Sequence, residues 1–202
     1  MINKYSCINI YENKKKNSKL SSQILYGEKF TILRRYKDWY KIKTSYDKYI
    51  GFIKKKKFES CVFNPTHKVS SLKAKVFLKP YKTSKVRMKL SFTSLIQVKS
   101  SNKGFFNFDN YWIQKSNVVP LNYKEKIFQR IKIFRNVKYK WGGKKFDGVD
   151  CSGLVQLFYK FNNLFCPRDT GPQFKYFKKL KSIKKDAIIF WKGHVCLLYT
   201  SD

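Results

Sequence analysis

The chain lacks the apolar segments that mark membrane-spanning and secreted proteins. None of its apolar runs reaches the length of about 18 residues that a bilayer span requires. The first 30 residues contain Lys14-Lys15-Lys16 but no apolar stretch of signal-peptide length. We therefore expect a cytoplasmic protein without a membrane span, and export by another route stays open.

Cysteine is sparse and histidine sparser. The five cysteines are widely spaced, odd in number and without a Cys-x-x-Cys pair, which argues against a disulfide framework and fits a reducing compartment. A zinc site built from Cys151, Cys166, His194 and Cys196 would match no common ligand spacing. We expect no metal and no cofactor.

Acidic residues are also few, with 12 Asp and Glu against 45 Lys and Arg, so the formal net charge is +33. The basic residues recur along the whole chain, with lysine runs at 54–57, 144–145, 178–179 and 184–185. No nucleic-acid recognition motif accompanies them. This distribution predicts a solvated basic surface and no dedicated nucleic-acid partner, with polyanion binding kept as an alternative function.

What is present is enough apolar sequence for a folded protein, 43% of the 202 residues. Breaks at Asn64-Pro65 and Val119-Pro120 predict three units, 1–63, 66–120 and 121–202. The first unit alternates turns with short apolar runs, which predicts a small antiparallel barrel. These runs are residues 7–11, 22–26, 30–33, 39–42 and 49–53.

The second unit repeats this pattern weakly. Residues 95–98 echo residues 30–33, and residues 110–113 echo residues 49–53. Two tandem barrels are therefore expected.

The third unit changes from strand to helix periodicity, so the whole chain is predicted to be α+β. Ile127, Ile131 and Phe134 recur at helical spacing and predict an amphipathic helix over 122–136. A second helix is expected to begin at Cys151, and a third to cover 172–180. Two strands, 187–191 and 194–199, are expected to pair through a turn at Lys192-Gly193.

Cys151 and His194 are the candidate catalytic pair. A helix N-terminus stabilises a thiolate, and an imidazole on a later strand would serve as its base. Asp150 and Ser152 flank the thiol, and backbone N–H groups at the helix start would hold an oxyanion. Taken singly, Cys151 would be a buried core cysteine and His194 a turn residue. The other histidine, His67, has no acidic or thiol neighbour in the sequence and is expected at the surface.

Four motifs in this order resemble the NlpC/P60 family of bacterial cell-wall cysteine peptidases. They are Tyr139-x-Trp141-Gly142-Gly143, Asp150-Cys151-Ser152-Gly153-Leu154, Pro167-Arg168-Asp169 with Gln173, and residues 190–195. The resemblance covers about residues 122–202 and implies a papain-like domain. The two units in front resemble bacterial SH3-like domains, as in peptidases that cleave the γ-D-glutamyl–L-diamino acid bond of murein peptides.

The resemblance implies roles for single residues. Cys151 would be the nucleophile and His194 the base, and Tyr139 would lie near the nucleophile and help to stabilise the oxyanion. Asp169, with Arg168 beside it, would bind the free amine of a terminal L-Ala. Glu28 and Tyr49 of the first barrel are further candidates for amine binding. The alternatives are an aromatic packed in the glycine turn for Tyr139, a helix N-cap for Asp169, a solvent-facing turn for Glu28 and barrel core for Tyr49.

The chain departs from the family pattern at its C-terminal end. The family has a third polar residue, usually His, about a dozen residues after the base, whereas here the sequence ends at Asp202, eight positions after His194. We therefore expect a catalytic domain without its last strands, acting as a monomer on peptidoglycan-derived peptides. A wall-peptide-binding remnant, a polyanion-binding protein and acyl transfer through the same thioester stay as alternatives.

Overall fold

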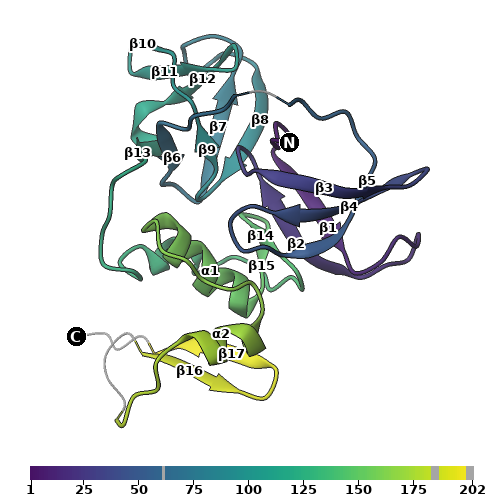
Figure 1. Ribbon diagram of the computed structural model, residues 1–202. Helices are drawn as coiled ribbons and strands as arrows, with labels where there is room; N and C mark the ends of the chain where they lie inside the picture. The colour runs from purple at the N-terminus through teal and green to yellow at the C-terminus, as the bar shows by residue number, and fades with distance from the viewer. Residues whose placement is uncertain (61, 183–186, 199–202) are drawn as a thin grey trace.

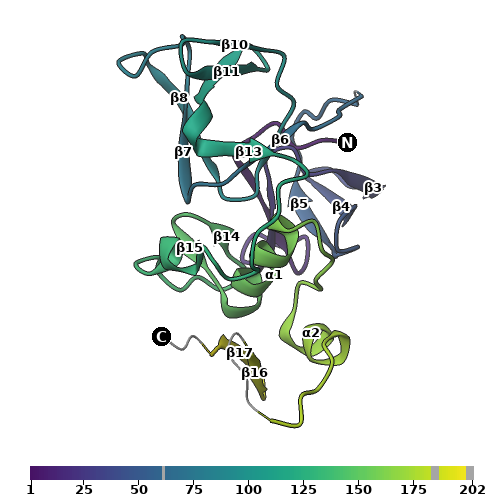
Figure 2. The same ribbon diagram turned by 90° about the vertical axis from the view of Figure 1, so that its left-hand side faces the viewer.

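The computed structural model describes residues 1–60, 62–182 and 187–198. Two units built from β-strands lie on one side of helix α1 (Cys151–Phe161), and the hairpin of β16 and β17 lies on the other side (Figures 1 and 2). Within the described ranges, no helix is long and apolar enough to cross a membrane. Helix α1 is therefore packed from both sides.

The first unit is a single five-stranded antiparallel sheet in the order β2-β1-β5-β4-β3. All five predicted strands are confirmed, with ends that differ by at most two residues. Apolar side chains from all five strands form its core, for example Ile10, Ile24 and Ile42. The strands are β1 (Cys7–Tyr11), β2 (Leu20–Leu25), β3 (Phe30–Arg35), β4 (Trp39–Thr44) and β5 (Ile50–Lys54).

The second unit repeats this topology. Its larger sheet has the order β8-β7-β12-β11-β10, with β12 in the place that β5 holds in the first sheet. The predicted echo of 49–53 in 110–113 is thus confirmed. The strands are β6 (His67–Val69), β7 (Lys73–Phe77), β8 (Val86–Ser91), β9 (Leu95–Ile96), β10 (Ser100–Asn102), β11 (Phe105–Phe108), β12 (Tyr111–Gln114) and β13 (Val118–Pro120).

The other echo is less direct. The place of β3 is taken by β10, whereas Leu95–Ile96 pairs with β6 in a small sheet of order β13-β6-β9. A 3-10 turn, η1 (Lys115–Asn117), connects β12 to β13. No ladder among the described residues joins the two edge strands of either five-stranded sheet, so both SH3-like sheets stay open.

The predicted helix over 122–136 is wrong. The segment forms successive turns and one 3-10 helix, η2 (Ile131–Phe134), whose backbone bonds run to the third preceding residue. Its apolar side chains still pack beneath α1, at spacings of both three and four residues. Like charges at Lys126 and Arg130 are unfavourable one helical turn apart, and Arg130 instead pairs with Glu125 at 2.8 Å. Tertiary packing therefore uses the apolar periodicity without an α-helix.

The third unit is otherwise close to expectation. Helix α1 begins at Cys151 as predicted. Helix α2 covers Thr170–Tyr176, so it begins two residues before and ends four residues before the predicted helix over 172–180, and Pro172 lies in its first turn. The predicted hairpin is confirmed as β16 (Ile188–Trp191) and β17 (His194–Leu197), with Gly193 at φ +76° in the turn. The second strand was predicted to continue to residue 199, which lies outside the described residues. Short strands β14 (Lys144–Lys145) and β15 (Gly148–Val149) precede α1.

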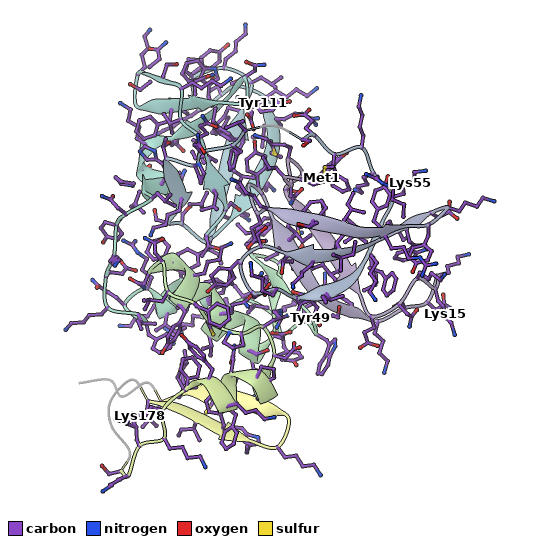
Figure 3. The ribbon with its side chains drawn as sticks, viewed as in Figure 1. Met1, Lys15, Tyr49, Lys55, Tyr111 and Lys178 are labelled. Atoms are coloured by element: carbon purple, nitrogen blue, oxygen red, sulfur yellow. The ribbon has the colours of Figure 1, made fainter. Side chains whose placement is uncertain are left out.

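Most lysines are exposed, but three are buried around α1. Lys15, Lys55 and Lys178 lie at the periphery of different parts of the molecule (Figure 3). Lys68, Lys144 and Lys160 are each at most 9% exposed. Charges are rarely buried without partners, so these three lysines indicate specific contacts between the units.

Lys68 of β6 makes one such contact at the C-terminal end of α1. Its ammonium group donates to the carbonyl of Tyr123 at 2.6 Å, to the carbonyl of Phe161, and to Asn163 Oδ1 at 3.3 Å. The last carbonyls of a helix have no intrahelical donor and carry partial negative charge. Burial lowers the pKa of Lys68 to about 8. The second unit thus caps the end of the helix.

Candidate active site

Asp150 fixes the start of α1 and the glycine loop before it. Its carboxylate accepts hydrogen bonds from the backbone N–H of Gly153 at 2.6 Å and from that of Gly142 at 2.8 Å. Gly142 has φ +70°, a left-handed conformation that glycine adopts without strain. The N-cap therefore holds the helix start and the loop in one arrangement, with Cys151 as the first helical residue.

Arg168 is buried behind this cap. Its guanidinium binds both oxygens of Asp150, at 3.0 and 2.6 Å, and also donates to Ser22 of β2 at 2.9 Å and to Ser152 at 3.0 Å. Burial opposes the charge of Arg168, but Asp150 outweighs burial and raises the pKa of the guanidinium. The side chains of Arg168, Asp150 and Ser152 are thus engaged with one another, and they join the first sheet to the start of α1.

The thiol of Cys151 is half-buried, and its sulfur lies 4.0 Å from the hydroxyl oxygen of Thr170 at the start of α2. The side chain of Asp150 accepts a hydrogen bond from the N–H of Gly153, and the backbone carbonyl of Asp150 accepts one from the N–H of Leu154 at 3.0 Å. The amides of Cys151 and Ser152 have no acceptor within the helix, because they belong to its first turn. They are available to an oxyanion beside the sulfur.

Tyr139 is 60% exposed and comes close to this group of residues. Its backbone bridges to Val149, next to the N-cap. Partial burial raises the pKa of Tyr139, and Cys151 and Asp150 add to this effect. The predicted place of Tyr139 near the nucleophile and its predicted contact with an oxyanion both stay predictions.

Asp169 offers a carboxylate that no described residue engages by a hydrogen bond. It occupies the N-cap position of α2, but its side chain makes no capping bond, and the residue is exposed. Desolvation raises the pKa of Asp169, Arg168 opposes this shift, and Asp150 adds to it. Burial likewise raises the pKa of Tyr49, with Asp169 among the neighbouring charges. Asp169 thus precedes Thr170, the residue beside the Cys151 thiol, whereas Tyr49 packs against the core of the first sheet.

Glu28 is not solvent-facing, because it is buried between the first sheet and α1. Its carboxylate pairs with the ammonium of Lys160, lies 3.8 Å from that of Lys144, and accepts the N–H of Leu25 at 2.5 Å. Burial disfavours ionisation, but the two lysines outweigh it and lower the pKa of Glu28. These contacts make Glu28 an interface residue. Its carboxylate is already paired with two lysine ammonium groups, where a substrate amine would have to bind.

His194 begins β17, where its ring lies 4.9 Å from that of Trp191. Val195 belongs to an apolar cluster that also includes Val155 of α1 and the half-buried Cys151. Successive side chains of a strand point to opposite faces, so His194 lies on the face opposite Val195. The hairpin packs against the helix, but no hydrogen bond among the described residues joins His194 to Cys151.

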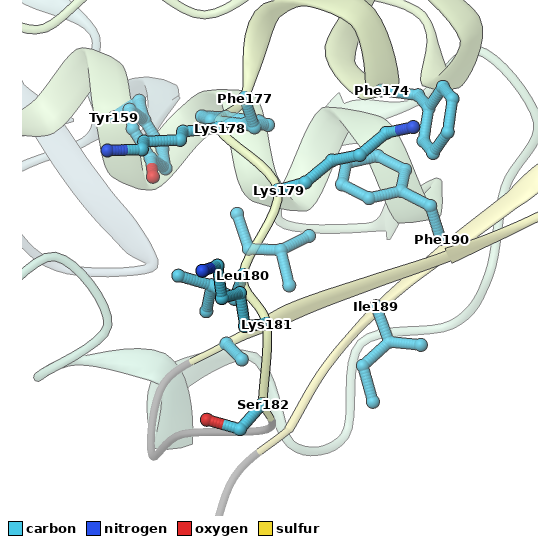
Figure 4. A pocket seen from close by; sticks show the side chains of 12 residues that line it. Tyr159, Phe174, Phe177, Lys178, Lys179, Leu180, Lys181, Ser182, Ile189 and Phe190 are labelled. Carbon is cyan, nitrogen blue, oxygen red and sulfur yellow. The ribbon is translucent and has the colours of Figure 1, made fainter.

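His67 lies in β6 of the second unit and is only partly exposed. The centre of its ring is 4.8 Å from that of Phe106. No group of three or more metal-binding side chains occurs among the described residues. A hollow of about 630 Å³ between α2 and β16 is lined by apolar residues and lysines such as Phe174, Phe177, Lys179 and Phe190 (Figure 4). It contains neither Cys151 nor His194, so it is separate from the candidate site.

The polar side chains that connect the first sheet to α1 were not predicted from the sequence. Gln156 of α1 donates to Asp47 Oδ2 at 2.9 Å, and Gln23 accepts the N–H of Lys144 at 2.7 Å. One signal was visible, since Lys160 and Gln156 interrupt an otherwise apolar helix. Their partners lie more than 100 positions away in the chain and could not be read from spacing.

Two family models match separate parts of the chain. Residues 136–201 match the model of the NlpC/P60 family, and residues 10–58 match the model of the bacterial dipeptidyl-peptidase Sh3 domain. A crystal structure of an NlpC/P60 family protein from Bacillus cereus superposes with a TM-score of 0.81 at 18% identity, covering 98% of this chain and 87% of that one. At this identity the likeness establishes the fold.

Two curated relatives share the name gamma-D-glutamyl-L-lysine dipeptidyl-peptidase. The Bacillus subtilis protein is 27% identical over 191 residues, which cover 85% of this chain and 64% of that protein. The Bacillus cereus protein is 24% identical over 182 residues, which cover 77% and 54%. The chain thus spans less than two thirds of the length of either relative.

Proposed function

From a chain that carries an NlpC/P60 domain behind a bacterial SH3 domain, we propose a cysteine peptidase that acts on murein peptides. Its substrate has a free N-terminal L-Ala, and the bond cleaved joins γ-D-Glu to an L-diamino acid, either diaminopimelate or lysine. One observation carries the proposal. The half-exposed Cys151 thiol at a helix N-terminus lies beside Thr170, and next to Thr170 stands the unengaged carboxylate of Asp169.

Substrate binding in this proposal depends on charge. The free amine of L-Ala is an ammonium group at neutral pH, and a carboxylate is its natural partner. Asp169 is favoured over Glu28 for this role, because Glu28 is already paired with Lys160 and Lys144. Tyr49, close to Asp169, is the second candidate.

The chemistry is acyl transfer to the thiol followed by hydrolysis. His194 takes the proton from Cys151, and the thiolate attacks the γ-carbonyl carbon of D-Glu while the amides of Cys151 and Ser152 hold the oxyanion. The C–N bond breaks, and the leaving amine takes the proton from the imidazolium. Water, deprotonated by His194, then cleaves the thioester and restores the thiol. Approach of His194 to Cys151 is part of the proposal.

A second candidate is a wall-peptide-binding protein without turnover. Two observations favour this candidate. His194 lies on the face of β17 opposite Val195, which packs against α1, and no hydrogen bond among the described residues joins His194 to Cys151. Such a protein would still use Asp169 and Tyr49 to hold the amine. The two candidates differ only in what happens to the bound peptide.

The test is incubation with L-Ala-γ-D-Glu-meso-diaminopimelate and with the lysine peptide, followed by mass spectrometry. We expect release of L-Ala-γ-D-Glu, a loss of rate on the order of 10⁴-fold or more in Cys151→Ala, and an unaffected rate in Cys7→Ala, a half-buried thiol in β1. An N-acetylated substrate should react much more slowly. Binding of the peptide by the folded wild type without any cleavage would establish the second candidate instead.

A further inference from the structure

A hollow of about 310 Å³ lies between the first sheet and the glycine-rich loop, away from the thiol of Cys151. Four lysines line it: Lys54 and Lys56 at and after the end of β5, and Lys140 and Lys145 from the loop that precedes α1. Two segments far apart in the chain therefore bring positive charge to one place, where β2 and β14 lie side by side (Figure 1).

No carboxylate is among the residues that line this hollow. Lys145 pairs with Asp147 at 2.8 Å, and Lys56 lies over the ring of Tyr5 at 4.6 Å. No hydrogen bond or ion pair engages the ammonium groups of Lys54 and Lys140 among the described residues. The like charges around this hollow repel each other, whereas an anion bound in the hollow would be attracted to each of them.

Neutral donors complete the lining. Asn9 and Tyr11 of β1 face the hollow, and the Asn9 side-chain amide reaches the Tyr11 hydroxyl only at 3.4 Å, which leaves donor capacity for a ligand oxygen. Asn9 is itself held by the amide of Gln23 at 2.9 Å, whose oxygen accepts the N–H of Lys144 at 2.7 Å. Hydrogen bonds within the first unit and between the first and third units therefore fix the wall of the hollow.

We propose that this hollow binds a compact phosphate-bearing anion, such as a phosphate monoester or a short oligophosphate. Lysine ammonium groups bind phosphate as point charges, and a ligand with several anionic oxygens can meet several of them at once. The volume is at the lower end of small-molecule pockets, which suits a short ligand and not a long polymer. This site is separate from the proposed peptidase site.

The probe is inorganic tripolyphosphate, titrated calorimetrically into the full chain at constant ionic strength. The test variant combines Lys54→Gln, Lys56→Gln and Lys140→Gln. The control combines Lys75→Gln, Lys82→Gln and Lys99→Gln, three exposed lysines of the second unit, so both variants lose the same charge. We expect one binding site, weakened about tenfold or more in the test variant and unchanged in the control.

Equal weakening in the two variants would overturn the proposal, because it would mean that the anion responds to net charge alone. Affinity that rises steadily with polyphosphate chain length, in wild type and test variant alike, would also overturn it and would indicate diffuse polyanion binding. Circular dichroism of each variant checks that it is folded before titration. Peptide cleavage is not needed for the readout, so the outcome is independent of the proposed peptidase activity.

Discussion

The two SH3-like units have the same order of strands in their larger sheets but contact α1 by different chemistry. The first unit meets the helix through charged and polar pairs, namely Glu28 with Lys160 in the last turn and Ser22 with Arg168 behind the N-cap. The second unit meets only the C-terminal part of α1, through the Lys68 cap and through Phe92, whose ring stacks on Phe161 at 4.6 Å. One topology thus serves both to position the nucleophile and to support the helix.

This division has a physical reason. Buried ion pairs fix relative orientation but tolerate little change, since a lost partner leaves an unpaired charge. Aromatic packing also stabilises an interface, but it depends less strictly on one geometry than a buried ion pair does. The first unit, which holds Arg168 behind the N-cap of α1, uses the more demanding kind of contact. Breaking each interface separately should therefore have different consequences.

The largest effect on stability is expected from Glu28→Gln in the first interface. The change leaves Lys160 and Lys144 buried without their carboxylate, and it should lower the free energy of unfolding by about 3–5 kcal/mol, measured by urea denaturation. Glu12→Gln, an exposed carboxylate on the same unit, should change it by less than about 0.5 kcal/mol. Equal effects of the two changes would contradict this account of the interface.

The same variant has a pH signature. Because the pKa of Glu28 is lower in the folded chain than its ordinary value of 4.5, its stabilisation is complete above that value and is lost as pH falls through the folded pKa. The wild type should thus lose stability in acid more steeply than Glu28→Gln.

Lys68→Met breaks the second interface and should have a smaller effect. The carbonyls of Tyr123 and Phe161 lose their donor, while the buried charge disappears, so we expect a loss of about 1–2 kcal/mol in urea denaturation. Lys75→Met on the exposed face of β7 is the matched control. Cleavage per folded molecule should stay at the wild-type value, since Arg168, and not Lys68, ties the N-cap beside the nucleophile to the first unit. A fall in that rate would mean that the two ends of the helix are coupled.

Asp169→Asn should leave stability almost unchanged and alter only recognition of the amine. We expect KM for the free-amine peptide to rise roughly 10- to 100-fold, with no change for the N-acetylated peptide. In the wild type KM should also rise as pH falls through the pKa of Asp169, which lies above its ordinary 3.8, because the protonated carboxyl no longer pairs with the ammonium. Asp38→Asn, an exposed turn carboxylate, serves as the control. A KM that does not depend on residue 169 would exclude it from amine binding.

Local sequence predicted much of the fold because the responsible interactions are local. The five strands of the first sheet follow from short apolar runs between turns, and the hairpin follows from Gly193. The start of α1 follows from Asp150, which caps Gly153 three residues later. Helix periodicity failed over 122–136, where the same apolar spacing was satisfied by 3-10 turns packed under α1.

The sequence by itself determined the candidate nucleophile, its place at a helix start and the family resemblance, since these depend on residues within a few positions of Cys151. Only the tertiary structure decided what Glu28 and Arg168 do. Glu28 meets Lys160 across 132 positions of the chain, and Arg168 meets Ser22 across 146. A side chain's charge is readable from sequence, but whether it is free to bind a substrate depends on which distant group folding brings against it.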